Sequence, residues 1–106
     1  MNLIVRSLAT ISIVASFITP AFGQDSAADV YTAKCKMCHG ADGLGNTPAG
    51  KIAKIVSFKD PSVVNASDSD LVQIIKNGKN KMPAFASKLS DDQINSVVAY
   101  IRTLQK

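Results

Sequence analysis

The segment most capable of chemistry contains both Cys residues and the single His of the chain: Cys35, Cys38 and His39 form a C-x-x-C-H motif. Two thiols three positions apart can add to the two vinyl groups of one haem. A His that directly follows the second thiol can then bind the haem iron from one face. The spacing therefore predicts one haem c, covalently attached through Cys35 and Cys38, with His39 as an iron ligand.

Three other kinds of site can use the same residues. A disulfide between Cys35 and Cys38 is compatible with an exported protein, but so short a loop gains little chain entropy from the crosslink. A thioredoxin-like redox pair needs a βαβ setting, and this sequence has no convincing strand. A zinc site needs four ligands, whereas there is no third Cys and no second His.

The second face of the iron needs another donor, and the remaining thioethers of the chain after Met1 are Met37 and Met82. Met37 lies between the two Cys residues and cannot reach across the ring. Met82 is left by elimination, in a segment where Pro83 restricts the backbone of Met82 toward an extended conformation. The alternative is that Met82 is an ordinary gap-filling core residue.

Helices must position these side chains. Helix-start signals precede four segments, at Ser26, at Thr47 with Pro48, at Ser67 and at Ser90. The third helix should end at Asn77 and Gly78, and the fourth carries one apolar stripe, formed by Ile94, Val97, Val98, Ile101 and Leu104. The Gly-rich segment 39–47 is predicted to be a loop, the helix after Thr47 to run through Ile55, and residues 58–65 to form a turn.

Length and composition set limits on the class of protein. With 106 residues the chain is one domain and cannot be a multi-domain enzyme. A formal charge of +4, spread along the chain, argues against nucleic acid as a partner. Residues 1–23 resemble a secretory signal peptide, which leaves a domain of residues 24–106 outside the cytoplasm. The alternative is an uncleaved anchor, although the apolar run is shorter than the ~20 residues of a spanning helix.

The chain resembles the class I cytochromes c over residues 26–106, and the segment from Asn77 to Asp91 resembles small soluble photosynthetic donor cytochromes. The resemblance implies an all-α fold of three to five helices, in which crossed N- and C-terminal helices surround one covalent haem. It also implies iron ligation by His39 and Met82. Tyr31, Val97 and Tyr100 match the family positions that pack at the helix crossing.

Two further segments carry the resemblance. Pro48 matches a family proline whose carbonyl accepts a hydrogen bond from the His ring N–H, which predicts that Pro48 orients His39. The loop Gly43-Leu44-Gly45-Asn46-Thr47 also resembles that of bacterial relatives with respiratory roles. Both photosynthetic and respiratory pathways therefore remain open.

Two protein ligands on the iron leave no position for a substrate, so the predicted function is single-electron transfer and not enzymatic catalysis. The expected route runs from a quinol-oxidising complex to a terminal oxidase or photosystem. The alternative is a peroxidase-like enzyme or gas sensor without Met82 on the iron. The haem pocket is expected to be apolar, lined by Ile52, Ile55, Phe58, Leu71, Ile75, Phe85 and Val98.

The expected partners are redox proteins that dock transiently at the haem edge of a monomer, with no small-molecule substrate and no nucleic acid. Docking through a ring of lysines would favour an acidic partner, although these side chains could equally form an ordinary solvated face. The lysines concerned are Lys34, Lys36, Lys51, Lys54, Lys79, Lys81 and Lys88. The expected location is the periplasm, or a lumen in a photosynthetic host.

Overall fold

The computed structural model of the chain describes residues 9–16 and 26–106. Most of the predicted signal peptide, including its cleavage point after Gly23, lies outside the described residues. Residues 9–16 are exposed and belong to no helix or strand. Among the described residues, every helix is too short or too polar to cross a membrane.

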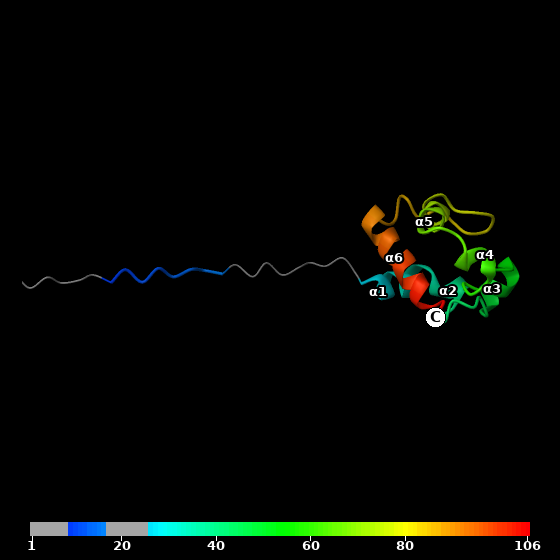
Figure 1. The fold of residues 1–106 in the computed structure, drawn as a ribbon, viewed down its shortest axis with the longest axis horizontal. Helices are drawn as coiled ribbons and strands as arrows, with labels where there is room; N and C mark the ends of the chain where they lie inside the picture. Colours follow the sequence, from blue (N-terminus) through cyan, green and yellow to red (C-terminus); the bar gives the residue numbers. More distant parts are fainter. Residues whose placement is uncertain (1–8, 17–25) are drawn as a thin grey trace, which may run out of the picture.

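The segment from residue 26 to residue 106 is helical, as predicted (Figure 1). The only β-type pairing in this segment is an isolated antiparallel bridge between Lys79 and Met82. Two of the helices, α2 and α4, are single turns of four residues, and with them the count exceeds the predicted three to five. The helices are α1 (Ala27–Lys34), α2 (Lys36–His39), α3 (Pro48–Ala53), α4 (Pro61–Val64), α5 (Asp68–Asn77) and α6 (Asp91–Thr103).

Side-chain caps explain where the longer helices begin. Ser26, Thr47 and Ser67 each accept a hydrogen bond from a backbone N–H in the first turn of α1, α3 and α5, respectively. Ser90 and Gln93 form a complete capping box at α6, in which Gln93 N donates to Ser90 Oγ at 3.1 Å and Ser90 N donates to Gln93 Oε1 at 2.8 Å. The four predicted helix starts are therefore confirmed.

Two predictions about the middle of the chain are wrong. Residues 58–65 contain α4 and are not only a turn, because Asp60 caps the helix and Pro61 occupies its first turn. Hydrogen bonds from the hydroxyl and the backbone N–H of Ser62 hold the pKa of Asp60 below its usual 3.8. Helix α3 ends at Ala53 and does not reach Ile55, because Lys54 adopts a left-handed conformation with φ of 54°.

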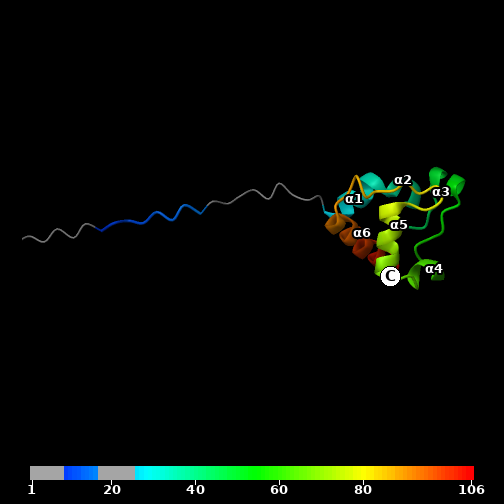
Figure 2. The ribbon, with the colours of Figure 1, turned by 90° about the horizontal axis from the view of Figure 1, so that it is seen from above.

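The core forms where α1 crosses α6, and α5 packs against α6 beside this crossing (Figures 1 and 2). Tyr31 of α1 and Val97 of α6 are almost fully buried, with 1 % and 0 % of their surfaces exposed. The ring of Tyr100 lies 5.1 Å from that of Tyr31, measured between centroids. The predicted packing of these three residues at the crossing is confirmed, and the crossing forms one side of the pocket described next.

Candidate functional site

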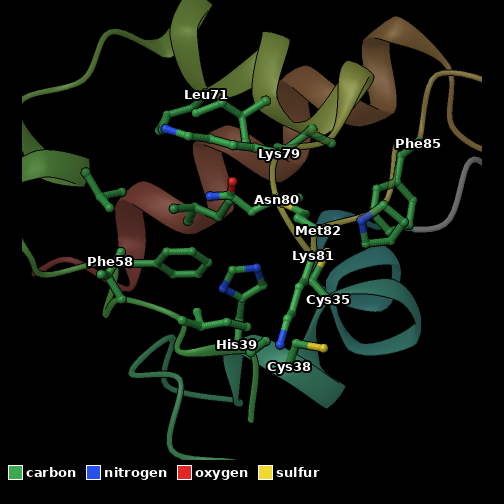
Figure 3. A pocket seen from close by; sticks show the side chains of 18 of the residues that line it. Cys35, Cys38, His39, Phe58, Leu71, Lys79, Asn80, Lys81, Met82 and Phe85 are labelled. Carbon is green, nitrogen blue, oxygen red and sulfur yellow. The ribbon is translucent and has the colours of Figure 1, made fainter. Parts of the chain in front are cut away.

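A pocket of about 530 Å³ lies between the end of α1, the helix α2 and the segment that follows α5 (Figure 3). Four of the five predicted site residues line it: Cys35, Cys38, His39 and Met82. They come from two segments separated by more than 40 positions in the sequence, so the fold and not local chain geometry brings them together. The fifth residue, Pro48, is exposed and lies outside the lining.

Local helix geometry arranges the two thiols and the imidazole. Cys35 lies between α1 and α2, and the N–H of His39 donates to the carbonyl of Cys35 at 2.9 Å. Both Cys residues are free and partly buried in this structure. Burial, and secondly the nearby thiol of Cys38, raise the pKa of Cys35 to about 11. The Cys35 thiol is therefore protonated at neutral pH.

His39 lines the pocket, and one of its two ring nitrogens, Nδ1, is buried without a hydrogen-bond partner. Its imidazole stacks on the ring of Phe58, with centroids 4.7 Å apart and an interplanar angle of 23°. Among the described residues, His39 Nδ1 is the one buried side-chain nitrogen or oxygen without a hydrogen-bond partner. Burial lowers the pKa of His39 below its ordinary 6.5. The ring is thus held neutral, which is the form that binds a metal.

The predicted hydrogen bond between His39 and the Pro48 carbonyl is absent from this structure, because His39 Nδ1 has no partner. The neighbouring residue Thr47 makes the contact between α3 and the motif instead: its hydroxyl donates to the carbonyl of Cys38 at 2.9 Å. The orientation of the imidazole comes from stacking on Phe58. A role for Pro48 with haem bound stays a prediction.

Met82 enters the pocket from a tight turn after α5 (Figure 3). The N–H of Met82 donates to the carbonyl of Lys79 at 2.9 Å, and the N–H of Lys79 donates to the carbonyl of Met82 at 3.1 Å. Asn80, at the tip of this turn, has a φ of 53°. Gly78 begins the segment with a φ of 74°, which is a conformation that favours glycine. Two reciprocal hydrogen bonds therefore hold the backbone that presents Met82.

Most of the residues predicted to form the apolar wall do line the pocket. The predicted residues that line the pocket are Ile55, Phe58, Leu71, Ile75 and Phe85. The prediction is wrong for Ile52, which is 73 % exposed: Gly50 faces the motif, and a residue two positions later points to the opposite side of a helix. It is also wrong for Val98, which is buried in the core, whereas Val97 and Ile101 of α6 face the pocket.

Sequence analysis missed the wall formed by α4 and the residues after it. Ser62, Val63 and Ala66 line the pocket from this side, and Ile74 lines it from α5. The signal for this wall was present, because Asp60 and Pro61 repeat the cap and first-turn pair recognised at Thr47 and Pro48. Of the seven lysines considered, those that line the pocket are Lys34, Lys54, Lys79 and Lys81.

The volume of the pocket, its apolar walls and its donor side chains all fit a haem. Ligand and cofactor pockets usually measure about 300–1,000 Å³ and have mainly apolar walls with a few placed polar groups. This pocket has two thiols, a neutral imidazole and a thioether among apolar side chains. Zinc chemistry fits less well, since the described residues contain no cluster of three or more His, Cys, Asp or Glu side chains.

Comparison with known proteins agrees with the fold and the pocket. The family described as "Cytochrome C oxidase, cbb3-type, subunit III" matches residues 23–101. The cytochrome c6 of Synechococcus sp. (strain ATCC 27167 / PCC 6312) is 37 % identical over 102 residues, which span 93 % of this chain and 88 % of that protein. The cytochrome c6 of Leptolyngbya boryana is 40 % identical over 74 residues, or 68 % of this chain and 81 % of that protein.

Solved structures of c-type cytochromes also superimpose on this chain. The KustC0563 c-type cytochrome superimposes with a TM-score of 0.70 at 28 % identity, over 76 % of this chain and 99 % of that chain. Cytochrome c6 from the diatom Phaeodactylum tricornutum superimposes with a TM-score of 0.55 at 27 % identity, over 74 % of this chain and 91 % of that chain.

Fold and pocket together define an all-helical protein with a site for one covalently bound haem. The chain belongs to the class I c-type cytochromes, the family shared by its sequence relatives and its structural neighbours. Its cofactor is haem c and it is a mono-haem electron carrier. The relatives thus favour the carrier over the enzyme or gas sensor that the sequence alone left open.

Proposed function

We propose that this chain is an exported one-electron carrier in which His39 and Met82 hold the iron of one haem c from opposite faces. The supporting observation is that the neutral imidazole of His39 shares one pocket with two thiols and the thioether of Met82. When bound, haem c supplies reversible cycling between ferrous and ferric iron. Residues 1–23 would act as the signal peptide, and residues 24–106 as the carrier domain.

The side chains of the pocket would favour the ferrous state. Ferrous haem carries one positive charge fewer than ferric haem, so apolar walls such as Leu71, Ile75 and Phe85 stabilise it relative to the ferric form. A thioether ligand acts in the same direction. The reduction potential is therefore expected to be higher than that of a site with two His ligands.

The expected partners are proteins that give and take single electrons. Lysines at the mouth of the pocket would guide an acidic partner, such as a quinol-oxidising complex, a terminal oxidase or a photosystem, into a small transient contact. The carrier would act as a monomer in the periplasm, or in a lumen if the host is photosynthetic.

Mass spectrometry and absorption spectra of the exported protein test this proposal. The mass should correspond to residues 24–106 plus one haem. Met82→Ala should lose the weak long-wavelength band of Met-ligated ferric haem and should bind carbon monoxide in the ferrous state. Met37→Ala is the matched control, because the side chain of Met37 is 80 % exposed and lies outside the pocket, and it should keep the band.

Three results would contradict the proposal. The first is a colourless exported protein with two unmodified thiols or a disulfide. The second is a Met82→Ala protein that keeps the long-wavelength band. The third is rapid carbon monoxide binding by the unmutated ferrous protein, which would instead indicate an enzyme or a gas sensor with an open iron position.

A further inference from the structure

The wall of the pocket formed by α4 is poorly held by its own structure. Helix α4 has only four residues, and it has little contact with the other helices. A single helical turn is not stable alone, because nucleation fixes several residues for few hydrogen bonds. Val63 and Ala66 nevertheless line the pocket from this segment and pack against the core. Something outside the segment must hold it in place.

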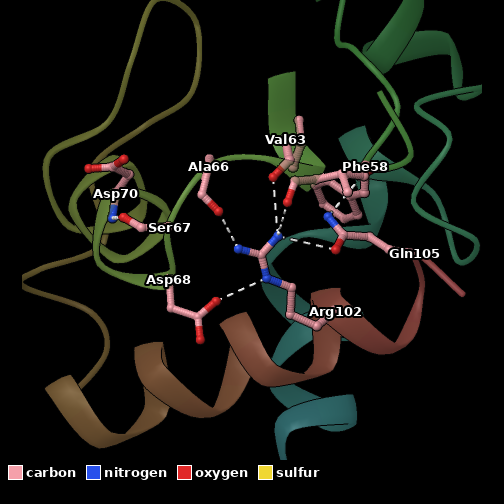
Figure 4. A network of polar contacts seen from close by, with 9 residues as sticks. Phe58, Val63, Ala66, Ser67, Asp68, Asp70, Arg102 and Gln105 are labelled. Carbon is pink, nitrogen blue, oxygen red and sulfur yellow. Dashed lines mark hydrogen bonds and ion pairs between the residues drawn. The ribbon is translucent and has the colours of Figure 1, made fainter. Parts of the chain in front are cut away.

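Arg102, in the last turn of α6, binds the backbone of this wall (Figure 4). Its Nη1 donates to the carbonyl of Val63 at 3.1 Å and to that of Val64 at 3.4 Å. Its Nη2 donates to the carbonyl of Ala66. These carbonyls lie at the end of α4 or just after it, and that of Val63 also accepts a hydrogen bond from the N–H of Ala66 at 3.2 Å. Arg102 thus supplies donors to three backbone acceptors of one pocket wall.

The remaining contacts of Arg102 fix the guanidinium itself. Its Nε donates to Asp68 Oδ1 at 2.9 Å, in the first turn of α5, and its Nη1 donates to Gln105 Oε1 at 3.2 Å. Gln105 Nε2 in turn donates to the carbonyl of Phe58 at 2.9 Å. Phe58 is the residue on which His39 stacks. The contacts of Arg102 and Gln105 therefore extend from Phe58 to Asp68, along the whole segment that contains α4.

We propose that Arg102 is a positioning residue: it holds the segment from Phe58 to Ala66 as a closed wall of the haem pocket and so keeps water from the haem. The inference rests on the proposed haem site. A planar guanidinium with five donors can serve several carbonyls and one carboxylate at once, whereas the ammonium of a Lys has one compact charge and cannot span them. Arg102→Lys therefore keeps the charge and removes most of the contacts.

The test compares variants of the haem-loaded protein by hydrogen exchange and by redox titration. The amides of Val63, Val64, Asn65 and Ala66 all donate to carbonyls within the wall, so their exchange reports on it directly. In Arg102→Lys these amides should exchange at least about tenfold faster, while the amides of α6 near Ile94 should not change. The reduction potential should fall, because water admitted beside the haem favours the ferric state.

Two control variants separate this role from general stabilisation. Asp68→Asn removes the ion pair but leaves the three carbonyl contacts, and it should keep the reduction potential. Lys76→Met removes the 3.0 Å ion pair between Lys76 and Asp91, which joins α5 to α6 away from the wall, and it should also keep the potential. If Arg102→Lys does not fold, Gln105→Ala is the milder variant and should change exchange and potential in the same directions.

Unchanged exchange of the four amides in Arg102→Lys would overturn the proposal. Faster exchange without a change in reduction potential would also overturn it, because Arg102 would then stabilise the wall without affecting the haem. Failure of the proposed function shows in other measurements: the exported protein would carry no haem, its unmutated ferrous form would bind carbon monoxide rapidly, or Met82→Ala would keep the long-wavelength band, whatever Arg102→Lys does.

Discussion

At the scale of single residues, the position of Met82 depends on Gly78. Gly78 has a φ of 74°, and a Cβ at this position would lie 2.6 Å from the carbonyl oxygen of Met82 and 3.0 Å from the N of Ala84. Both contacts involve backbone atoms, which cannot rotate away as a side chain can. Any residue other than glycine must therefore displace the segment that carries Met82.

We expect Gly78→Ala to reduce the free energy of unfolding by about 1–3 kcal/mol, since it combines a strained φ with a backbone clash. It should also weaken the long-wavelength band of Met-ligated ferric haem. Denaturant unfolding and an absorption spectrum measure the two effects. Asn80→Gly is the matched control: it relieves the positive φ of 53° in the same turn and should keep the band and the stability. A Gly78→Ala protein with an intact band would contradict this account of the loop.

Residues that act through local spacing could be predicted from the sequence. Cys35, Cys38 and His39 stand on one short stretch, and the structure brings them to one pocket with Met82. The exposure of Ile52 and the absence of a hydrogen bond from His39 to Pro48 could not be predicted in the same way. Each depends on how α3 is rotated against the motif, and that rotation is set by the contacts of Thr47 and Gly50 in the folded chain.

At the scale of elements, helices were predicted correctly where a side-chain cap precedes several turns, because several turns show a repeating apolar face. Helices α5 and α6 each follow a Ser cap and carry a repeating apolar face, and both lie where predicted. Helix α4 also begins at a side-chain cap, Asp60, but it has only one turn, so no apolar periodicity accompanies it. Its place in the pocket depends on Arg102, which is 38 or more positions away from Val63 and Val64 in the sequence.

The contact between α3 and the C-x-x-C-H motif requires a glycine. A Cβ on Gly50 would collide with the carbonyl oxygens of Cys38 and Gly45, both of which are backbone atoms. We expect Gly50→Ala to push α3 away from the motif and to lower the free energy of unfolding by about 1–3 kcal/mol, in the range of overpacked cores. Denaturant unfolding of the haem-loaded protein measures this loss.

Helix propensity alone would predict the opposite sign, because Ala is about 1 kcal/mol better than Gly inside a helix. The sign of the change in the free energy of unfolding therefore shows whether close packing or helix propensity dominates at Gly50. Ala49→Gly, one position earlier in α3, is the control, and it should cost about 1 kcal/mol through propensity without any clash. A Gly50→Ala protein more stable than the unmutated one would contradict the close approach of α3.

At the scale of the whole molecule, the resemblance to class I cytochromes c predicted the crossing of α1 and α6, whereas the C-x-x-C-H spacing had already predicted a single haem site. Composition and periodicity could not have predicted the crossing, because it depends on contacts between the two ends of the domain. Tyr31 and Tyr100 illustrate this: their rings lie 5.1 Å apart although 69 positions separate them in the sequence. Closure of the pocket by Arg102 belongs to the same class of long-range contact.

The distribution of charge leads to the last prediction. Lys34 at the end of α1 and Lys79 after α5 both lie at the pocket, on segments that are distant in the sequence. The formal charge of the whole chain is only +4, so any guidance of a partner comes from where the lysines lie rather than from their sum. The double substitution Lys34→Gln with Lys79→Gln should therefore slow reduction by an acidic redox partner at low ionic strength.

Stopped-flow reduction at increasing salt concentration measures this effect. The unmutated protein should react more slowly as salt rises, since the Debye length falls from about 30 Å at 0.01 M to about 8 Å at 0.15 M. The double variant should depend less on salt. The control, Lys59→Gln with Lys106→Gln, removes the same charge from lysines outside the pocket and should keep the salt dependence. Equal rates for both double variants would assign the effect to net charge, and a rate that does not depend on salt would exclude steering by lysines altogether.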